Sequence, residues 1–435
     1  MRQVLIVAPQ FPPSNLQAVH RNRYLATHLP KFGWKVKVLT VKPAYYEEKL
    51  DYELEKLLPL DLEVIRTPAF PIKPLRLIGD ISLRALWWHY AKICSLAKKE
   101  KIDILYISIP PNYSSLLGPL IFRRFGIPYV LDYQDPWVPP QPTKKKFLSK
   151  HWFSERLAYL FEPWVLRKVS FITAVAEGYY KVALMRYPWL DSACCLALPI
   201  GIDEEDFRYL DTHPRPPYIF DPRDGNFNFV YAGAMLPYAY AIFEILFKAL
   251  VIFRDKFPSF FKRLRFYFIG TGKSPNDTKG FNVKPLADRY HLSDVVFEHP
   301  HRIPYLDVLN HLKNASAILI LGSVESYYTP SKVFQAVLAK RPIIAILHKK
   351  SSAIEVLKNR KATAKVITFD ETAILDETGY IEKIIQAIQE ISNVYSSEEN
   401  INWQGLEEYR AQKITQRMAE LFENILKSKR SDDNG

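Results

Sequence analysis

Short apolar segments that alternate with helical patterns constrain the fold of this chain more than any other feature of its sequence. Strands alternating with helices imply βαβ units and a parallel sheet. In the first half we predict strands at 3–8, 35–41, 103–108, 128–135, 168–176 and 194–201. The same pattern then predicts a strand and turn at 227–235, a strand and glycine turn at 264–272, and strands at 295–300, 316–322, 341–347 and 364–369. We therefore predict an α/β protein with two Rossmann-like, doubly wound domains.

A polar, proline-rich stretch without periodicity separates the two rounds of this pattern. We predict an N-terminal domain at 1–205, a linker at 206–227 and a C-terminal domain at 228–404. An amphipathic pattern at 407–427 predicts a long helix, so the final segment, 405–435, should consist of this helix and a frayed tail. In open α/β sheets ligands bind beyond the carboxyl ends of the strands, so the candidate site residues are sought there.

Composition narrows the classes of partner. Lysine and arginine outnumber aspartate and glutamate by 59 to 46, a net charge of +13. This balance favours anionic partners such as nucleotide phosphates, although basic residues also simply solubilise a surface. The three cysteines, two of them adjacent, match neither a disulfide framework nor metal-ligand spacing, so we expect a reducing cytoplasm and no metal.

Membrane association is expected to be peripheral at most. No apolar run reaches the roughly 18 residues that span a bilayer, and the first run is too short for a signal-peptide core. The stretch 144–168 places lysines beside Phe147, Trp152, Phe153 and Trp164. Such a composition suits the anionic inner face of a membrane, or else a solvated charge run with core aromatics.

The loop after the first predicted strand resembles a phosphate-binding loop without its glycines. Residues 11–29 follow an apolar run and lead into a helix, but they contain no glycine. Bare backbone therefore cannot come close to a phosphate. Asn15 and Gln17 would supply side-chain donors and Arg21 a charge. The alternative is an ordinary strand-to-helix connection.

Two later loops of the first half carry polar residues at predicted strand ends. Asp135 lies at the carboxyl end of the strand at 128–135, where it could bind acceptor hydroxyls or take part in proton transfer. Asn112 follows the strand at 103–108 and would orient the acceptor. Both residues could instead cap the next segment.

The second half offers a diphosphate site. Gly270 and Gly272 follow a predicted strand, as in a turn that contacts a nucleotide. Pro330 and Ser331 begin a predicted helix, and Lys332 lies in its first turn. A cation there is unusual on the helix dipole alone, but it suits a bound diphosphate, with Glu325 left to hold sugar hydroxyls.

Taken in order, these motifs resemble the family 4 retaining glycosyltransferases, whose GT-B architecture has two Rossmann-like domains facing a central cleft. The resemblance runs from "FPPSNLQAVHRNRYLATHL" through "VLDYQDPW" and "LPIGIDEEDF" to "FVYAGAM", "FIGTGK" and "PSKVFQAVLAKRPIIA". It implies hexosyl-type transfer from a nucleotide-sugar to a glycan or lipid-linked acceptor, with configuration retained. It also implies that the nucleotide-sugar is a substrate, with no cofactor, and that the final helix crosses back to the N-terminal domain.

The resemblance also assigns roles to residues. Asp135, Asn112, Glu325 and Lys332 would form the catalytic set. The residues implied in donor binding are Asn15, Gln17, Arg21, Gly233, Gly270, Gly272, His301, Arg302, Thr329, Pro330, Ser331, Lys332, Val333 and Gln335.

The chain departs from the family pattern at three places. "NLQA" replaces the usual glycine pair of the opening loop, and "GAMLPYAYA" lacks the Arg and Lys that brace the diphosphate. Gln335 stands where the second glutamate of an E-x7-E pair is usual, and Tyr327 where the first is. These departures predict an altered donor site.

Two other classes of function remain open. A non-catalytic GT-B protein would bind a nucleotide or glycan, or act as a scaffold, and the departures favour it. A dinucleotide-dependent or nucleic-acid-binding protein is the other class, but the first loop lacks G-x-G-x-x-G. We therefore expect no nucleic-acid partner.

Overall fold

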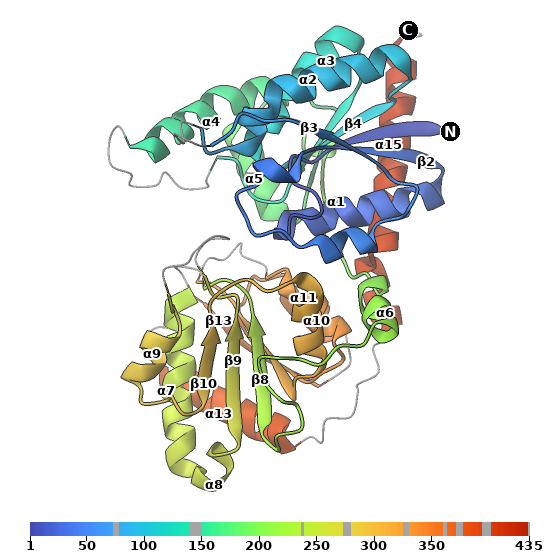
Figure 1. The fold of residues 1–435 in the computed structure, drawn as a ribbon. Coiled ribbons are helices and arrows are strands. Elements are labelled where there is room, and N and C mark those ends of the chain that lie inside the picture. The colour runs from blue at the N-terminus through green and yellow to red at the C-terminus, as the bar shows by residue number, and fades with distance from the viewer. Residues whose placement is uncertain are drawn as a thin grey trace. The chain divides into compact units, whose positions relative to one another are not determined.

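The computed structural model describes residues 1–72, 78–138, 149–235, 239–272, 280–324, 330–359, 363–370, 377–393 and 402–433. Its contacts divide the chain into two compact units, shown in Figure 1. Unit 1 consists of residues 1–201 and 410–435, and unit 2 of residues 202–409. We predicted domains at 1–205 and 228–404. The segment predicted as a linker between them, 206–227, lies within unit 2.

Unit 1 is a parallel sheet of seven strands in the order β3-β2-β1-β4-β5-β6-β7. Its strands are β1 (Arg2–Val7), β2 (Trp34–Val41), β3 (Glu63–Thr67), β4 (Ile104–Ile109), β5 (Tyr129–Tyr133), β6 (Phe171–Ala174) and β7 (Cys195–Ala197). Its α-helices are α1 (Gln17–His28), α2 (Ile81–Lys99), α3 (Leu117–Phe125), α4 (Lys150–Leu166), α5 (Glu177–Arg186) and α15 (Ala411–Asp433). The sequence analysis missed β3, because this edge strand is only partly buried and lacks a clear apolar run.

Alternate residues of the strands of unit 1 serve two different cores. Val4 and Ile6 of β1 pack on one side of the sheet, whereas Leu5 and Val7 pack on the other. The first core includes Phe422 of α15, whose ring lies edge-on to Trp34 at 5.3 Å between centroids. In Figure 1 the red helix α15 accordingly runs beside the blue β1 and α1.

Unit 2 is a second parallel sheet, in the order β10-β9-β8-β11-β12-β13. Its strands are β8 (Phe227–Ala232), β9 (Leu264–Ile269), β10 (Val296–His299), β11 (Ala317–Leu321), β12 (Ile343–His348) and β13 (Ala364–Phe369). Its α-helices are α6 (Glu205–Thr212), α7 (Tyr240–Lys256), α8 (Pro258–Phe261), α9 (Lys284–Arg289), α10 (Tyr305–Lys313), α11 (Lys332–Leu338), α12 (Ala353–Asn359), α13 (Glu377–Asn393) and α14 (Trp403–Leu406). Both sheets therefore have the doubly wound order of a Rossmann fold, as predicted.

The predicted linker, 206–227, is fastened to unit 2 along much of its length. It begins within α6, and Arg215 forms an ion pair with Asp307 at 3.0 Å. The backbone N–H groups of Tyr218 and Ile219 both donate to Nε2 of His311, each at 3.2 Å. The predicted linker lacked periodicity because turns and side-chain contacts, rather than regular elements, hold much of it in place.

A buried ion pair joins three segments of unit 1. The Arg21 guanidinium donates Nε and Nη2 to the two carboxylate oxygens of Asp132, each at 2.7 Å. Its Nη1 donates to the carbonyl oxygens of Leu198 and Pro199 at 2.7 and 2.9 Å. Thr173 Oγ1 also donates to Asp132 at 2.7 Å. Burial acts to lower the pKa of Arg21, but the Asp132 carboxylate outweighs it and holds this pKa above its ordinary value.

Replacing Arg21 should therefore destabilise unit 1 strongly. We expect Arg21→Ala to lower the free energy of unfolding by about 3–5 kcal/mol, because it leaves Asp132 buried and unpaired. Urea unfolding would measure this loss. The double variant Arg21→Met/Asp132→Leu should be more stable than Arg21→Ala, and Arg124→Ala, at an exposed arginine, should change little. A single variant no less stable than the double would contradict this account.

Candidate functional site

The carboxyl edge of the sheet in unit 2 brings three of the predicted turns together. The Gly233 N–H donates to the Ile269 carbonyl at 2.7 Å, which joins the turn after β8 to the end of β9. The Gly270 N–H donates to His299 O at 2.7 Å, and Gly272 N–H to Pro300 O at 3.0 Å. Gly233, Gly270 and Gly272 therefore lie in adjacent turns, as the order of the strands requires.

Gly233 and Lys332 fit against each other. A Cβ atom on Gly233 would lie 1.8 Å from both Cε and Nζ of Lys332, and the φ angle of Gly233 is +148°. Only glycine leaves space for the lysine at this backbone conformation. Gly233 and Lys332 are 99 positions apart in the sequence, yet the lysine side chain lies directly over the glycine backbone, where no side chain intervenes.

A buried tyrosine holds the lysine in this position. Lys332 Nζ donates to the hydroxyl of Tyr231 at 3.0 Å and lies 4.5 Å from the centroid of its ring. The same hydroxyl donates to the carbonyl of Ala234 at 3.0 Å. Burial raises the pKa of Tyr231 above its ordinary value, so the phenol stays neutral where it meets the lysine.

Glu298 of β10 connects two loops at this edge of the sheet, the turn after β9 and the start of α9. Its carboxylate accepts the backbone N–H groups of Val283 and Lys284 at 2.9 and 2.7 Å. It also accepts from the hydroxyl of Thr271, which lies between Gly270 and Gly272. The sequence analysis did not select Glu298, because a single glutamate within a predicted strand gives no sign of its partners.

The residues around the start of α11 differ in what they present to this edge. Ser331 and Lys332 are half-buried, whereas Pro330 is buried. Val333 is fully buried within the core, and the Gln335 side chain is 8% exposed. The side chain of Val333 is therefore committed to packing.

The remaining predicted residues of unit 2 lie after β10 or outside the described part of the chain. His301 is exposed, Arg302 is half-buried, and the rings of His299 and His301 lie 6.2 Å apart. Glu325 and Thr329 lie outside the described residues, as does Tyr327. Their predicted roles in sugar and donor binding stay predictions.

In unit 1, Arg21 departs from its predicted donor role, whereas the roles of Asn15 and Gln17 stay predictions. Gln17 begins α1 and is exposed, and Asn15 is half-buried just before it. The guanidinium of Arg21 is bound inside unit 1 by Asp132 and two carbonyl groups. Arg21 is therefore a structural residue here, and we no longer place it among the donor-binding groups.

A polar cavity of about 250 Å³ lies near the predicted acceptor residues. Its lining includes Asp80, Arg84 and Glu48 together with Pro110 and Pro111. The side chain of Asp80 accepts the Leu83 N–H at 2.9 Å. Burial raises the pKa of this carboxyl, opposed by hydrogen bonds that include the Asn112 backbone. Asn112 thus adjoins the cavity, whereas Asp135 is exposed beyond β5.

The sequence analysis missed these cavity residues, which come from separate segments. Gln10 Nε2 donates to Glu48 at 2.8 Å, and Arg84 Nη2 donates to Glu47 at 3.2 Å. The only local indication was Asp80, which precedes a helical pattern as an N-cap would. Pairings between residues 37 or 38 positions apart have no local pattern.

The described residues lack both a metal-binding cluster and a membrane-spanning helix. No group of three or more His, Cys, Asp or Glu side chains there is arranged to hold a metal ion. No helix in the same part of the chain combines the length and the apolar character of a membrane span.

Part of unit 1 is similar to a known protein family. Residues 18–181 match the family model described as "Glycosyl transferase 4-like domain". Unit 1 therefore contains a segment that is similar to glycosyl transferase 4-like domains. This match supports the resemblance to the family 4 glycosyltransferases, and the comparison with curated protein sequences gave no match.

Solved structures that match nearly the whole chain show that it has the GT-B fold, with two Rossmann-like units. Sucrose-phosphate synthase from Thermosynechococcus elongatus matches with a TM-score of 0.65 and 14% identity, over 98% of this chain and all of that one. HepE from Anabaena in complex with UDP and glucose matches at 0.63 and 13%, with the same coverage. A glycosyltransferase from Rickettsia africae matches at 0.58 and 14%, over 98% of this chain and 99% of that one.

The fit between Gly233 and Lys332 is testable by stability alone. We expect Gly233→Ala to cost about 1–3 kcal/mol, because its φ is positive and its Cβ displaces the lysine. Calorimetry would show the double variant Gly233→Ala/Lys332→Ala to be more stable than the sum of the two single effects predicts. Gly225→Ala measures the φ effect alone, since Gly225 has φ +77° and no atom within 4 Å of a Cβ. Additive effects at Gly233 and Lys332 would contradict the fit.

Proposed function

We propose that the protein is a glycosyltransferase whose unit 2 holds a nucleotide diphosphate sugar at the carboxyl edge of its sheet. The observation that carries this proposal is Lys332, held by Tyr231 over the backbone of Gly233. A cation beside glycine turns offers charge and close backbone approach, which a diphosphate needs. HepE, a protein of the same fold, was solved with UDP-glucose.

The proposed reaction transfers the sugar with retention of configuration. The bond between the anomeric carbon and the diphosphate oxygen breaks, and the electron pair leaves with the nucleoside diphosphate. Lys332 stabilises the negative charge that develops there. The acceptor hydroxyl forms the new bond from the same face, and its proton passes to the departing phosphate. A hexose donor and a glycan or lipid-linked acceptor complete the proposal, which places the protein in polysaccharide biosynthesis.

The polar cavity of unit 1 suits an acceptor rich in hydroxyl groups. Glu48 and Asp80 accept hydrogen bonds, and Arg84 donates them. A hydroxyl group can both donate and accept, so one sugar ring can satisfy this mixed lining. We propose that Asn112, adjoining the cavity, and Asp135 orient the hydroxyl that reacts.

Removing the lysine tests the donor site. Because a hydrogen bond to a charged group contributes about 1.5–3 kcal/mol, we expect Lys332→Ala to weaken binding of a nucleoside diphosphate about 10–100-fold. Thermal shift with a panel of nucleoside diphosphates and their sugars would measure this and identify the base. Lys262→Ala, at an exposed lysine just before β9, is the matched control. Equal shifts in both variants would contradict a role for Lys332.

A non-catalytic protein of the same fold is the second candidate, favoured by Gln335 in place of the usual glutamate. A transfer assay separates the two candidates. Transfer to an acceptor, with the product anomer assigned by NMR, supports the enzyme and tests retention of configuration. Saturable nucleotide binding with neither transfer nor donor hydrolysis favours the non-catalytic protein.

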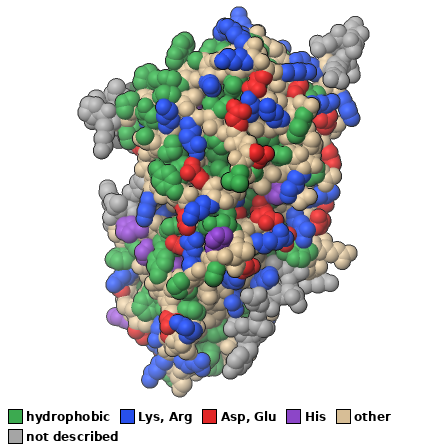
Figure 2. Space-filling model, turned by 45° about the vertical axis from the view of Figure 1, so that its right-hand side comes forward, with side chains coloured by type: hydrophobic (Ala, Val, Ile, Leu, Met, Phe, Trp, Pro, Cys, Tyr) green, Lys and Arg blue, Asp and Glu red, His purple; other side chains and the backbone are tan. Residues whose placement is uncertain are grey.

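An exposed apolar stripe on α4 supports peripheral association with a membrane. Phe153, Leu157, Leu160 and Trp164 recur at helical spacing and are 50, 40, 64 and 42% exposed. The opposite side of α4 is buried, including Glu162, which pairs with Arg186. Figure 2 shows hydrophobic side chains gathered at its upper left, toward the side where Figure 1 draws α4.

Charge around the stripe favours an anionic lipid surface. Arg156, Arg167 and Lys168 are exposed on or just after α4. Aromatic rings beside basic groups are typical of the interface of a membrane. The lysines at 144–146, part of the predicted basic stretch, lie outside the described residues.

Vesicle binding tests the stripe. We expect Leu160→Glu to reduce cosedimentation with phosphatidylglycerol vesicles, because it puts a negative charge on the apolar face. Binding should also fall as salt rises. Leu60→Glu is the matched control, since Leu60 is fully exposed in a loop of unit 1. Equal loss in both variants, or no binding by the unmodified protein, would overturn the membrane proposal.

A further inference from the structure

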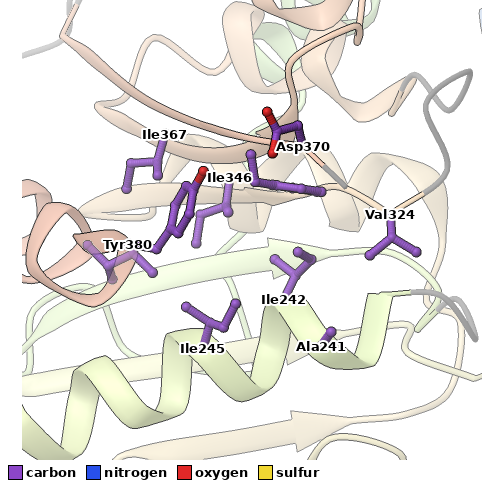
Figure 3. A pocket seen from close by; sticks show the side chains of 10 residues that line it. Ala241, Ile242, Ile245, Val324, Ile346, Ile367, Asp370 and Tyr380 are labelled. Atoms are coloured by element: carbon purple, nitrogen blue, oxygen red, sulfur yellow. The ribbon is translucent and has the colours of Figure 1, made fainter. Parts of the chain in front are cut away.

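Unit 2 contains an apolar cavity of about 230 Å³ that the proposed transfer does not use. It lies between α7, α13 and the carboxyl ends of β12 and β13 (Figure 3). Its described lining includes neither Lys332 nor any of the three glycines of the donor site. The cavity is therefore separate from the donor site, although both lie toward the same edge of the sheet.

Isoleucines from four elements make up half of its described lining residues. Ile245 of α7, Ile346 of β12 and Ile384 of α13 are at most 9% exposed. Figure 3 shows the side chains of Ile245 and Ile346 directed into the space between helix and sheet. Water has too few partners in such a space, because an ordered water needs two or more polar groups. An apolar cavity of about 150 Å³ takes benzene, so this one has room for a larger apolar group.

Polar atoms lie at one side of the cavity. Asp370 and the Tyr380 hydroxyl are the polar side-chain groups of the described lining, and Figure 3 shows both on the same side. Asp370 also forms an ion pair with Lys349 at 2.9 Å, so this side carries little net charge. A ligand group at this polar side must either donate a hydrogen bond to the carboxylate or form a hydrogen bond with the phenol. It should itself be uncharged.

We propose that this cavity is a second binding site, for a small apolar molecule with one uncharged hydroxyl group. The apolar body, an aromatic ring or a short alkyl chain, occupies the space between Ile245, Ile346 and Ile384. The hydroxyl group donates to Asp370 or pairs with Tyr380. The site needs no nucleotide, and it stands whether or not the chain transfers sugars.

Binding of 4-ethylphenol tests the site. We expect a saturable rise in Tm, and titration calorimetry should show binding of 4-ethylphenol at least about tenfold tighter than that of 4-ethylbenzoate. The carboxylate of 4-ethylbenzoate meets Asp370, and ethylbenzene, which has no hydroxyl group, should also bind more weakly. Absence of saturable binding by 4-ethylphenol, or equal binding of all three compounds, would overturn the proposal.

A cavity-filling variant locates the binding. Ile245→Phe should weaken 4-ethylphenol binding at least about tenfold, because the larger ring occupies the same space. Ile252→Phe makes the same change on the exposed side of α7 and should leave binding intact. Ala241→Leu serves if Ile245→Phe does not fold. Equal binding in the filled and control variants would overturn the assignment to this cavity, and parallel nucleoside diphosphate shifts would report on the donor site separately.

Discussion

The ion pair between Arg21 and Asp132 fixes the geometry on which unit 1 depends. It joins α1 to the end of β5, and through Leu198 and Pro199 to the chain that follows β7. A buried guanidinium can remain only where every donor finds an acceptor, so these segments keep their register together.

The two units place polar groups at their sheet edges by different means. In unit 2 this depends on a glycine: because Gly233 has no Cβ atom, the Lys332 side chain can lie against its backbone. Unit 1 has no glycine in its opening loop, and there Ser14 donates to the buried Glu48. Gln10 also donates to Glu48, so two polar side chains of that loop fix it to a neighbouring segment of unit 1.

The sequence predicted the sheets well because buried parallel strands leave continuous apolar runs. It failed where a residue acts through a distant partner. Arg21 looked like a ligand-binding cation, since its carboxylate partner lies 111 positions away. Val333 matches a position that the resemblance assigns to donor binding, yet its side chain is fully buried in the core. Nothing local marks the cavity near Ile245, because its walls come from separate helices and strands.

Unit 1 is assembled from both sides of unit 2 in the sequence, and this has a consequence for synthesis. The ring of Phe422 packs on Trp34, although residues 202–409 are translated between them. At about 5–20 residues per second, translation of that insert takes roughly 10–40 s. During this time the strands of unit 1 have emerged while the face that α15 will cover is still open to water. A nascent chain of this kind is a natural client for chaperones until its final helix arrives.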